Sequence, residues 1–288
     1  ISIIGDTPIF TAYDSADVWA QQPLFQLDSK GFPTVVSGVP PDYFCADGQL
    51  WGNPLYQWKA HKKTDYLWWT NRIRKALEDV DYLRIDHFRA FESHWEVPFG
   101  APNAIQGEWK KGPGIDFFHT LRRLLGDLPL IAEDLGIITD EVRALREEAG
   151  FPGMRILQFA FGNDKNNAYL PHMCDKNSIM YSGTHDNDTT LGWYASATEA
   201  EKDHYRRYLN VDGQDAAWDF IRLAFASPAV FAIVPLQDVL NLDSHYRMNR
   251  PGISEGNWAF RFHWGQWHAG YTEGLYYLAT LFGRYPER

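Results

Sequence analysis

The sequence predicts an α/β fold in which parallel strands alternate with helices, and a (β/α)8 barrel is favoured over a doubly wound sheet. Short apolar runs recur between amphipathic stretches and loops rich in Gly, Pro and Asp, a rhythm typical of βαβ units. The connections after the strands are the long ones, above all residues 6–64 and 87–116. In a barrel these loops build the active site. Because we find no linker and no internal repeat, we expect one domain over residues 1–288.

Each element follows from its local pattern. Apolar runs bounded by loop residues predict strands at 2–5, 82–85, 130–132, 155–159, 179–182 and 230–234. Helical periodicity and start signals predict helices at 64–78, 117–125, 140–149, 197–209 and 216–225. In the first of these helices the apolar positions include Leu67, Ile73 and Leu77, and Asp140 supplies a start signal for the third. Six strands, however, cannot close an eight-stranded barrel.

The composition excludes several classes of protein. The 288 residues are 45% apolar and 22% charged, which is the balance of a compact globular chain and not of a disordered one. The net charge is −10, so nucleic acid and anionic membrane surfaces are not expected partners. No apolar stretch is long enough to span a bilayer.

The cysteines and the N-terminal residues are informative about the cellular compartment of the protein. Two cysteines, Cys45 and Cys174, make no disulfide framework, so we expect a reducing compartment, the cytoplasm. The N-terminus has neither the basic region nor the cleavage site of a signal peptide. The chain begins without Met in an apolar run, and we expect it to be a piece of a longer protein.

Aromatic residues make up 16% of the chain, and several lie in polar loops, among them Trp51, Tyr56, Trp58, Trp109 and Trp258. Packing in the core accounts for most of the aromatic residues. A loop aromatic, however, presents a flat apolar face with a polar tip. This suits the apolar C–H face of a sugar ring, so the loop aromatics are candidates for sugar binding.

Three predicted strands end in acidic residues, at Asp86, Glu133 and Asp186. Strand alternation puts Arg84 on the same face as Asp86, which favours the ionised carboxylate and suits a nucleophile. Glu133 follows Ile131 and Ala132 with no basic neighbour, so burial is expected to raise its pKa, as in a general acid. Each acidic residue has a second interpretation, as a helix cap or a loop salt-bridge partner.

The segment around Asp186 leaves more alternatives open. His185 and Asp186 are either a hydrogen-bonded loop pair or donors and acceptors for sugar hydroxyls, and as a weaker alternative they ligate a divalent metal. Motifs for nucleotide binding, zinc proteases and thiol redox chemistry are absent from the sequence, namely GxxxxGK[ST], GxGxxG after a strand, HExxH and CxxC. We therefore expect neither a cofactor nor a metal.

Taken together, longer motifs resemble a known family along the whole chain. They are IIGDTPIF at 3–10, DSADVW at 14–19, SGVPPDYF at 37–44, GQLWGNPLYQW at 48–58, RIDHFRAF at 84–91, GEWKKGPG at 107–114, IAEDLG at 131–136, SGTHDNDT at 182–189 and RMNRPGISEGNWAFR at 247–261. The sequence is similar to the 4-α-glucanotransferases, also called amylomaltases or disproportionating enzymes, which form glycoside hydrolase family 77 of the α-amylase clan. The resemblance implies a (β/α)8 TIM-type barrel of which this chain has roughly strands 3 to 8.

The resemblance also implies roles for individual residues. Asp86 takes the position of the nucleophile, Glu133 that of the general acid/base and Asp186 that of a third carboxylate that grips ring hydroxyls. The implied substrate-binding residues are Arg84, His185, Asp6, Trp51, Tyr56, Trp109 and Asn187. No cofactor is implied. The partners implied are a maltooligosaccharide or starch-type or glycogen-type donor, a glucose or maltooligosaccharide acceptor, and a missing N-terminal segment or a second chain that supplies the first strands.

The family's chemistry would be a retaining double displacement, for which the Asp86 and Glu133 carboxyl groups should lie about 5–5.5 Å apart. Three alternatives stay open at this point: an α-glucan hydrolase of the same clan, an inactive glucan-binding fragment, and a metal-dependent hydrolase.

Overall fold

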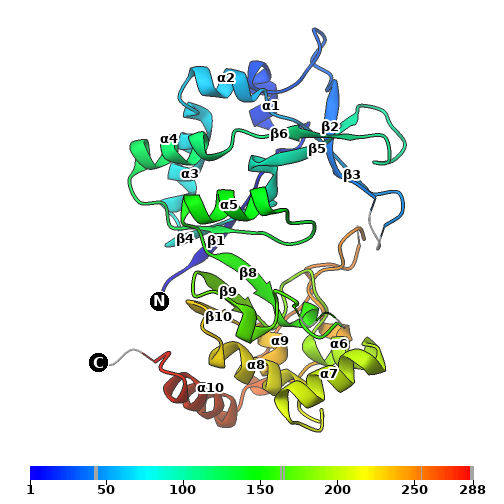
Figure 1. The fold of residues 1–288 in the computed structure, drawn as a ribbon, viewed down its shortest axis with the longest axis vertical. Coiled ribbons are helices and arrows are strands. Elements are labelled where there is room, and N and C mark those ends of the chain that lie inside the picture. The colour runs from blue at the N-terminus through cyan, green and yellow to red at the C-terminus, as the bar shows by residue number, and fades with distance from the viewer. Residues whose placement is uncertain (42–44, 163, 165, 254, 286–288) are drawn as a thin grey trace. The chain divides into compact units, whose positions relative to one another are not determined.

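The computed structural model describes residues 1–41, 45–162, 164, 166–253 and 255–285 (Figure 1). Residues 42–44 of the motif at 37–44 and residue 254 of the motif at 247–261 lie outside the described residues. The chain divides into two compact units, Ile1–Gly153 and Met154–Arg288, and each is described by itself. The expectation of a single barrel domain over 1–288 stays a prediction.

The elements alternate between strand and helix along much of the chain (Figure 1). The strands are β1 (Ile4–Pro8), β2 (Val35–Val39), β3 (Gln49–Pro54), β4 (Tyr82–Asp86), β5 (Ser93–Pro98), β6 (Glu108–Lys111), β7 (Leu130–Ala132), β8 (Gly153–Ile156), β9 (Ser178–Tyr181) and β10 (Phe231–Ile233). The α-helices are α1 (Ala16–Ala20), α2 (Trp58–Lys63), α3 (Leu67–Leu77), α4 (Ile115–Leu125), α5 (Asp140–Ala149), α6 (Thr190–Ser196), α7 (Glu199–Leu209), α8 (Ala216–Ala226), α9 (Leu236–Val239) and α10 (Ala269–Leu281).

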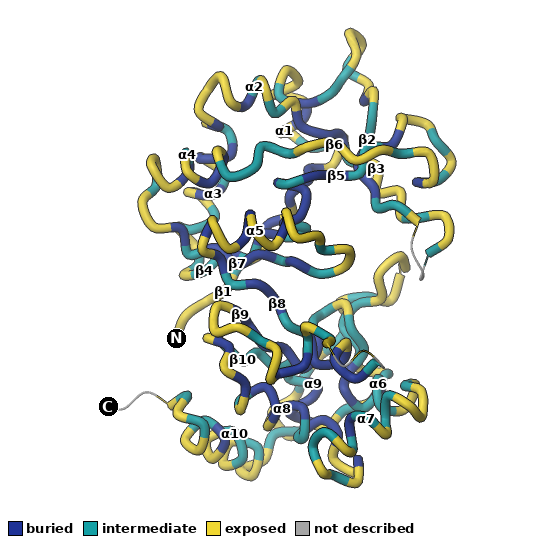
Figure 2. The backbone as a smooth tube through the Cα atoms, viewed as in Figure 1, coloured by how far each residue is buried: buried dark blue, intermediate teal, exposed yellow. Residues whose placement is uncertain are grey.

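In the first unit, β1, β4 and β7 form a parallel sheet in the order β1-β4-β7. Within β4, Leu83 and Ile85 are buried, while Tyr82, Arg84 and Asp86 are only partly buried. This alternation is the period of a strand, and it confirms the face predicted for Arg84 and Asp86. Buried residues of β4 and β7 join aromatic and aliphatic residues of α3, α4 and α5 in one core, which lies inside the unit (Figure 2).

Two helices show how well their boundaries follow from the sequence. For α5 the prediction of 140–149 is confirmed, because Gly150 (φ 77°) ends the helix in the left-handed conformation that glycine adopts most readily. The helix predicted at 64–78 starts later, at Leu67. Asp65 and Tyr66 both have positive φ, 49° and 54°, and this turn separates α2 from α3.

An antiparallel sheet in the order β3-β2-β5-β6 was not predicted from the sequence. Its strands lie within the long connections after β1 and β4, which we expected to be loops. Gly and Pro interrupt their apolar pattern, and the ladder between β2 and β3 shifts register between Val36 and Gly38. The sheet matters for the site because Trp51 lies on β3 and Trp109 on β6.

The second unit has a sheet in the order β10-β9-β8, in which β10 and β9 are parallel. Helices α6, α7 and α8 follow β9, and α7 begins with a capping box between Thr198 and Glu201. The strand predicted at 155–159 ends at Ile156, since residues 157–159 form a short 3-10 helix. Across the part of the chain that the structure describes, no helix is long and apolar enough to cross a membrane.

Candidate active site

Pairing between β1 and β4 brings an arginine between two carboxylates. Asp6 lies beside Arg84 in the register of the two strands. Arg84 Nε lies 2.9 Å from Asp6 Oδ1, and Arg84 Nη2 donates to Asp6 Oδ2 at 2.9 Å. A third nitrogen, Arg84 Nη1, lies 3.1 Å from Asp86 Oδ1. The arginine side chain is 12% exposed and the two carboxylates about half exposed. Asp6 thus fixes Arg84, and Arg84 in turn forms an ion pair with Asp86.

Glu133 directly follows β7, and its backbone is hydrogen-bonded to residues at the end of β4. Its N–H donates to the carbonyl oxygen of Ile85 at 3.1 Å, and its own carbonyl oxygen accepts from Phe88 at 3.0 Å. The carboxylate accepts one backbone N–H on each oxygen, from His87 at 2.7 Å on Oε2 and from Leu135 at 2.8 Å on Oε1. His87 has φ 53°, which is uncommon for a residue other than glycine. This local backbone conformation directs the His87 N–H toward Glu133.

Burial raises the pKa of Glu133 to about 7, and the negative charge of Asp86 acts in the same direction. The Leu135 N–H, the cationic Arg84 and the His87 N–H oppose the rise. A carboxyl group with this pKa is partly protonated at neutral pH and exchanges its proton readily. The rise in pKa that the sequence predicted for Glu133 is therefore confirmed, and its chemical role stays a prediction.

Two of the predicted aromatic residues keep an exposed face. Trp51 is 39% exposed, and its ring packs edge-on against His87 with centroids 4.7 Å apart. Trp51 is thus linked through His87 to the backbone that holds Glu133. Trp109 is 40% exposed, with the guanidinium of Arg89 stacked over its ring at 3.9 Å. Trp51 and Trp109 are thus about equally exposed, and part of the Trp109 ring is covered by Arg89.

The structure places Tyr56 in the core, not on the surface. Its side chain is 2% exposed, its hydroxyl donates to the Ile9 carbonyl oxygen at 2.6 Å, and its ring packs against Trp58 and Trp69. Burial raises the pKa of its hydroxyl. With no open ring face, Tyr56 cannot stack on a sugar, and we leave it out of the proposed substrate site.

The second unit holds the loop that carries the third predicted carboxylate. His185 Nε2 lies 3.4 Å from Asp186 Oδ2, so the two side chains are neighbours in this loop. Asp186 remains 50% exposed, which leaves room for a ligand. Asn187 uses its amide oxygen inside the loop, where it accepts from Thr184 N and Oγ1 at 2.9 and 2.8 Å. That oxygen therefore shapes the loop.

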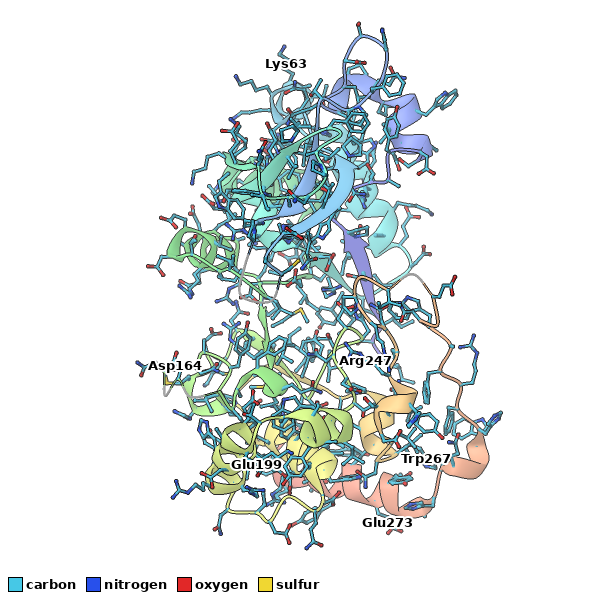
Figure 3. All side chains as sticks on the ribbon, turned by 90° about the vertical axis from the view of Figure 1, so that its right-hand side faces the viewer. Lys63, Asp164, Glu199, Arg247, Trp267 and Glu273 are labelled. Atoms are coloured by element: carbon cyan, nitrogen blue, oxygen red, sulfur yellow. The ribbon has the colours of Figure 1, made fainter. Side chains whose placement is uncertain are left out.

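Three further residues lie beside His185 and Asp186, and of these the sequence pointed only to Trp258, as a loop aromatic. Asn249 Nδ2 donates to Asp186 Oδ1 at 2.6 Å, and Arg247, labelled in Figure 3, donates to the Asp186 carbonyl oxygen at 2.6 Å. The ring of Trp258 lies 5.5 Å from that of His185, and Trp258 has φ 59°, rare for a bulky residue. All three lie in the motif at 247–261, which is the signal that could have pointed to Arg247 and Asn249.

The described residues contain no group of three or more His, Cys, Asp or Glu side chains placed to hold a metal ion.

Comparison with known proteins assigns the family. The family profile described as 4-alpha-glucanotransferase, glycoside hydrolase family 77, matches residues 1–267. The chain belongs to this family. The 4-alpha-glucanotransferase of Synechocystis sp. is 49% identical over 99% of the chain, and that of Thermus thermophilus 50% identical over 91%. The chain spans 57% and 54% of the length of these two proteins, respectively.

A solved structure agrees with the family assignment. The amylomaltase from Streptococcus agalactiae in complex with acarbose has a TM-score of 0.95 and 38% identity over 98% of this chain and 58% of its own. The amylomaltase from Corynebacterium glutamicum, at 17% identity, shares the fold with a TM-score of 0.74. The predicted α/β class is confirmed, and the chain corresponds to part of the barrel fold of these enzymes.

Proposed function

We propose that the protein containing this chain is a 4-α-glucanotransferase. It would transfer a segment of a 1,4-α-D-glucan to the 4-hydroxyl of a glucose or maltooligosaccharide acceptor, with retention of configuration. The observation that supports this most is a partly buried Glu133, whose pKa is raised to about 7 in part by the charge of Asp86, together with the ion pair between Asp86 and Arg84. A retaining glycosidase-type displacement requires one carboxyl group that can give a proton and a second that acts as a carboxylate.

In the first step, Asp86 attacks the anomeric carbon while Glu133 gives its proton to the glycosidic oxygen. The bond between the anomeric carbon and that oxygen breaks, and a glycosyl ester on Asp86 forms. In the second step, the Glu133 carboxylate takes the proton of the acceptor hydroxyl, whose oxygen attacks the anomeric carbon and releases Asp86. For Asp186 we propose the role of gripping ring hydroxyls, supported by its half-exposed carboxylate and its fixed position on Asn249.

The test is incubation of the purified protein with maltotriose, followed by separation of the products by length. A ladder of longer maltooligosaccharides with released glucose is expected from the wild type and is expected to be absent from Asp86→Asn. Products that are all shorter than maltotriose would identify the hydrolase of the same clan instead. If the folded chain gives no products, the assay on the longer protein tells whether residues outside this chain are needed.

The cytoplasmic location also stays a proposal, supported by the two cysteines, which make no disulfide framework. The Arabidopsis thaliana relative, 50% identical, is named as chloroplastic/amyloplastic, so fractionation of the source cells decides the compartment.

A further inference from the structure

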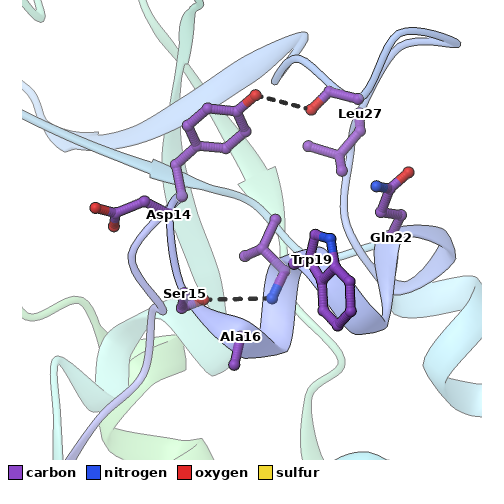
Figure 4. Close-up of a pocket in the computed structure, with 9 residues that line it drawn as sticks. Asp14, Ser15, Ala16, Trp19, Gln22 and Leu27 are labelled. Atoms are coloured by element: carbon purple, nitrogen blue, oxygen red, sulfur yellow. Dashed lines mark hydrogen bonds between the residues drawn. The ribbon is translucent and has the colours of Figure 1, made fainter.

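A surface pocket in the first unit lies around α1, in the segment that follows β1. It has a volume of about 420 Å³ and is lined by residues of α1 and of the segments on either side of that helix, among them Tyr13, Asp14, Trp19, Gln22, Leu27 and Gly31 (Figure 4). None of the residues that line it belongs to the site described above. Its volume falls within the range of small-molecule sites.

The walls of this pocket are held in place without a ligand. The turn at 28–32 is fixed by Asp28, whose Oδ1 accepts from the N–H groups of Lys30 and Phe32 at 2.8 and 3.0 Å. Gly31 has φ 85°, so the turn needs a glycine there. Tyr13 bridges the pocket to this turn because its hydroxyl donates to the Gly31 carbonyl oxygen at 3.1 Å. The pocket is therefore preformed, which lowers the entropic cost of binding.

Trp19 is the unusual residue of this wall, because its side chain is 79% exposed. An indole left in water is an apolar surface that a ligand can cover with a gain in free energy. Gln22 lies on the neighbouring 3-10 turn, and its amide nitrogen would be 3.8 Å from a methyl group added at Gly31. Among the described residues, no hydrogen bond is made by the side chains of Trp19, Gln22 or Asp14.

The chemistry of the lining selects the ligand. No Lys or Arg lines the pocket, so a phosphate or another anion has no partner there. A neutral molecule with one apolar face and several hydroxyl groups matches an open indole ring beside an amide, a phenol hydroxyl and a carboxylate. We propose that this pocket is an accessory binding site for the sugar rings of a glucan chain. The choice of an α-1,4-linked glucan as that ligand rests on the proposed function.

An accessory site of this kind would act by tethering. A long glucan held at Trp19 raises the effective concentration of its other segments at the active site, whereas a short substrate that occupies one site at a time gains nothing. The expected signature is a higher KM for amylose with an unchanged kcat when the site is removed, and no change with maltotriose.

The test uses the full chain with 5-fluorotryptophan in place of tryptophan, in the Asp86→Asn background so that no glucan is consumed. Fluorine NMR then follows each indole, and the Trp19 signal is assigned by its loss in Trp19→Phe. Maltoheptaose should shift the Trp19 signal saturably, and Gln22→Ala should weaken that binding at least several-fold. Trp264 is the matched control, since it is 80% exposed in the second unit and does not line the pocket.

In parallel, Trp19→Ala and Trp264→Ala in the active background are assayed on amylose and maltotriose. Only Trp19→Ala should raise the KM for amylose several-fold. The inference is overturned if maltoheptaose does not shift the Trp19 signal. It is also overturned if only tetramethylammonium or inorganic phosphate shifts that signal. The proposed function fails separately, because the maltotriose ladder does not depend on Trp19: a missing ladder with a saturable Trp19 shift would refute the transferase and keep the sugar site.

Discussion

Opposing local effects together determine the pKa of the Glu133 side chain. Burial and the charge of Asp86 raise the pKa, and the backbone N–H groups of Leu135 and His87, together with Arg84, limit the rise. Since the group must be protonated to act as an acid, the rate depends on pH through this balance.

We predict that kcat/KM for maltotriose falls on the alkaline side with an apparent pKa near 7, the pKa of Glu133. Below that pH the acid is protonated, and above it the protonated fraction, and with it the rate, drops about tenfold per pH unit. A pH profile from 5 to 10 measures this. An alkaline limb centred near the ordinary pKa of a glutamate, or one absent up to pH 9, would contradict the assignment of Glu133 as the acid.

Arg84 offers a matched pair of variants. Arg84→Met removes the cation that lowers the pKa of Glu133, so its alkaline limb should move to higher pH, with kcat reduced about 100-fold because Asp86 loses its partner. Arg84→Lys keeps the charge but not the two-nitrogen contact with Asp6, so kcat should fall while the alkaline limb stays in place. Identical pH profiles for Arg84→Met and wild type would show that Arg84 does not act on Glu133.

What the sequence could predict at this scale depended on local neighbours. Arg84, Asp86 and Glu133 were found because strand alternation and apolar flanks can be seen in a few residues. Tyr56 was misjudged as a sugar-stacking residue because a loop aromatic and a core aromatic look alike in sequence, and only the packing of Trp58 and Trp69 around its ring tells them apart.

At the scale of elements, the loop between β9 and α6 is closed by one buried side chain. Asp238 of α9 is 1% exposed and accepts from Ser182 Oγ at 2.6 Å, from Thr190 N at 2.7 Å and from Thr190 Oγ1 at 2.8 Å. Ser182 and Thr190 flank the loop that carries His185 and Asp186. Asp238 therefore holds the two ends of this loop together.

Asp238→Ala should lower the free energy of unfolding by about 2–4 kcal/mol, because three buried donors lose their acceptor. Urea titration measures the loss. Asp243→Ala is the control from the same segment: among the described residues the exposed Asp243 side chain bonds only its neighbour His245, so the loss of stability should be much smaller than for Asp238→Ala. Equal stability of the two variants would mean that the loop does not depend on Asp238.

The elements themselves were predicted unevenly. The strands of the sheets β1-β4-β7 and β10-β9-β8 were found because each is a compact apolar run. The antiparallel sheet of β2, β3, β5 and β6 was missed because Gly38, Gly52 and Pro54 break its alternation, and because pairing between distant segments leaves no local signal. Arg247 and Asn249 were likewise visible only as part of a longer motif.

At the scale of the whole molecule, the family assignment is what joins the carboxylates of two separately described units into one proposal. The strand pattern alone left a barrel and a doubly wound sheet open, and the motifs decided between them. The net charge of −10 suits a neutral sugar substrate better than a phosphorylated one.

A mechanism that retains the anomeric configuration predicts a short distance between the two catalytic carboxyl groups. The Asp86 and Glu133 carboxyl groups should lie about 5–5.5 Å apart in a crystal structure of the enzyme. The linkage in the products, followed by proton NMR during the reaction, should be α from the first turnover. A β-configured initial product, or a separation near 9 Å, would indicate inversion instead.

The central claim is that Asp86 forms a covalent bond to the sugar, and this can be observed directly. In a Glu133→Gln variant, an α-maltosyl fluoride can still react because fluoride leaves without a proton, whereas release of the glycosyl group is slowed by the missing base. Mass spectrometry of peptides from the quenched protein should then show a maltosyl group on Asp86, absent when Asp86→Asn is added. Fluoride release with no labelled peptide, or a label on another residue, would contradict the account.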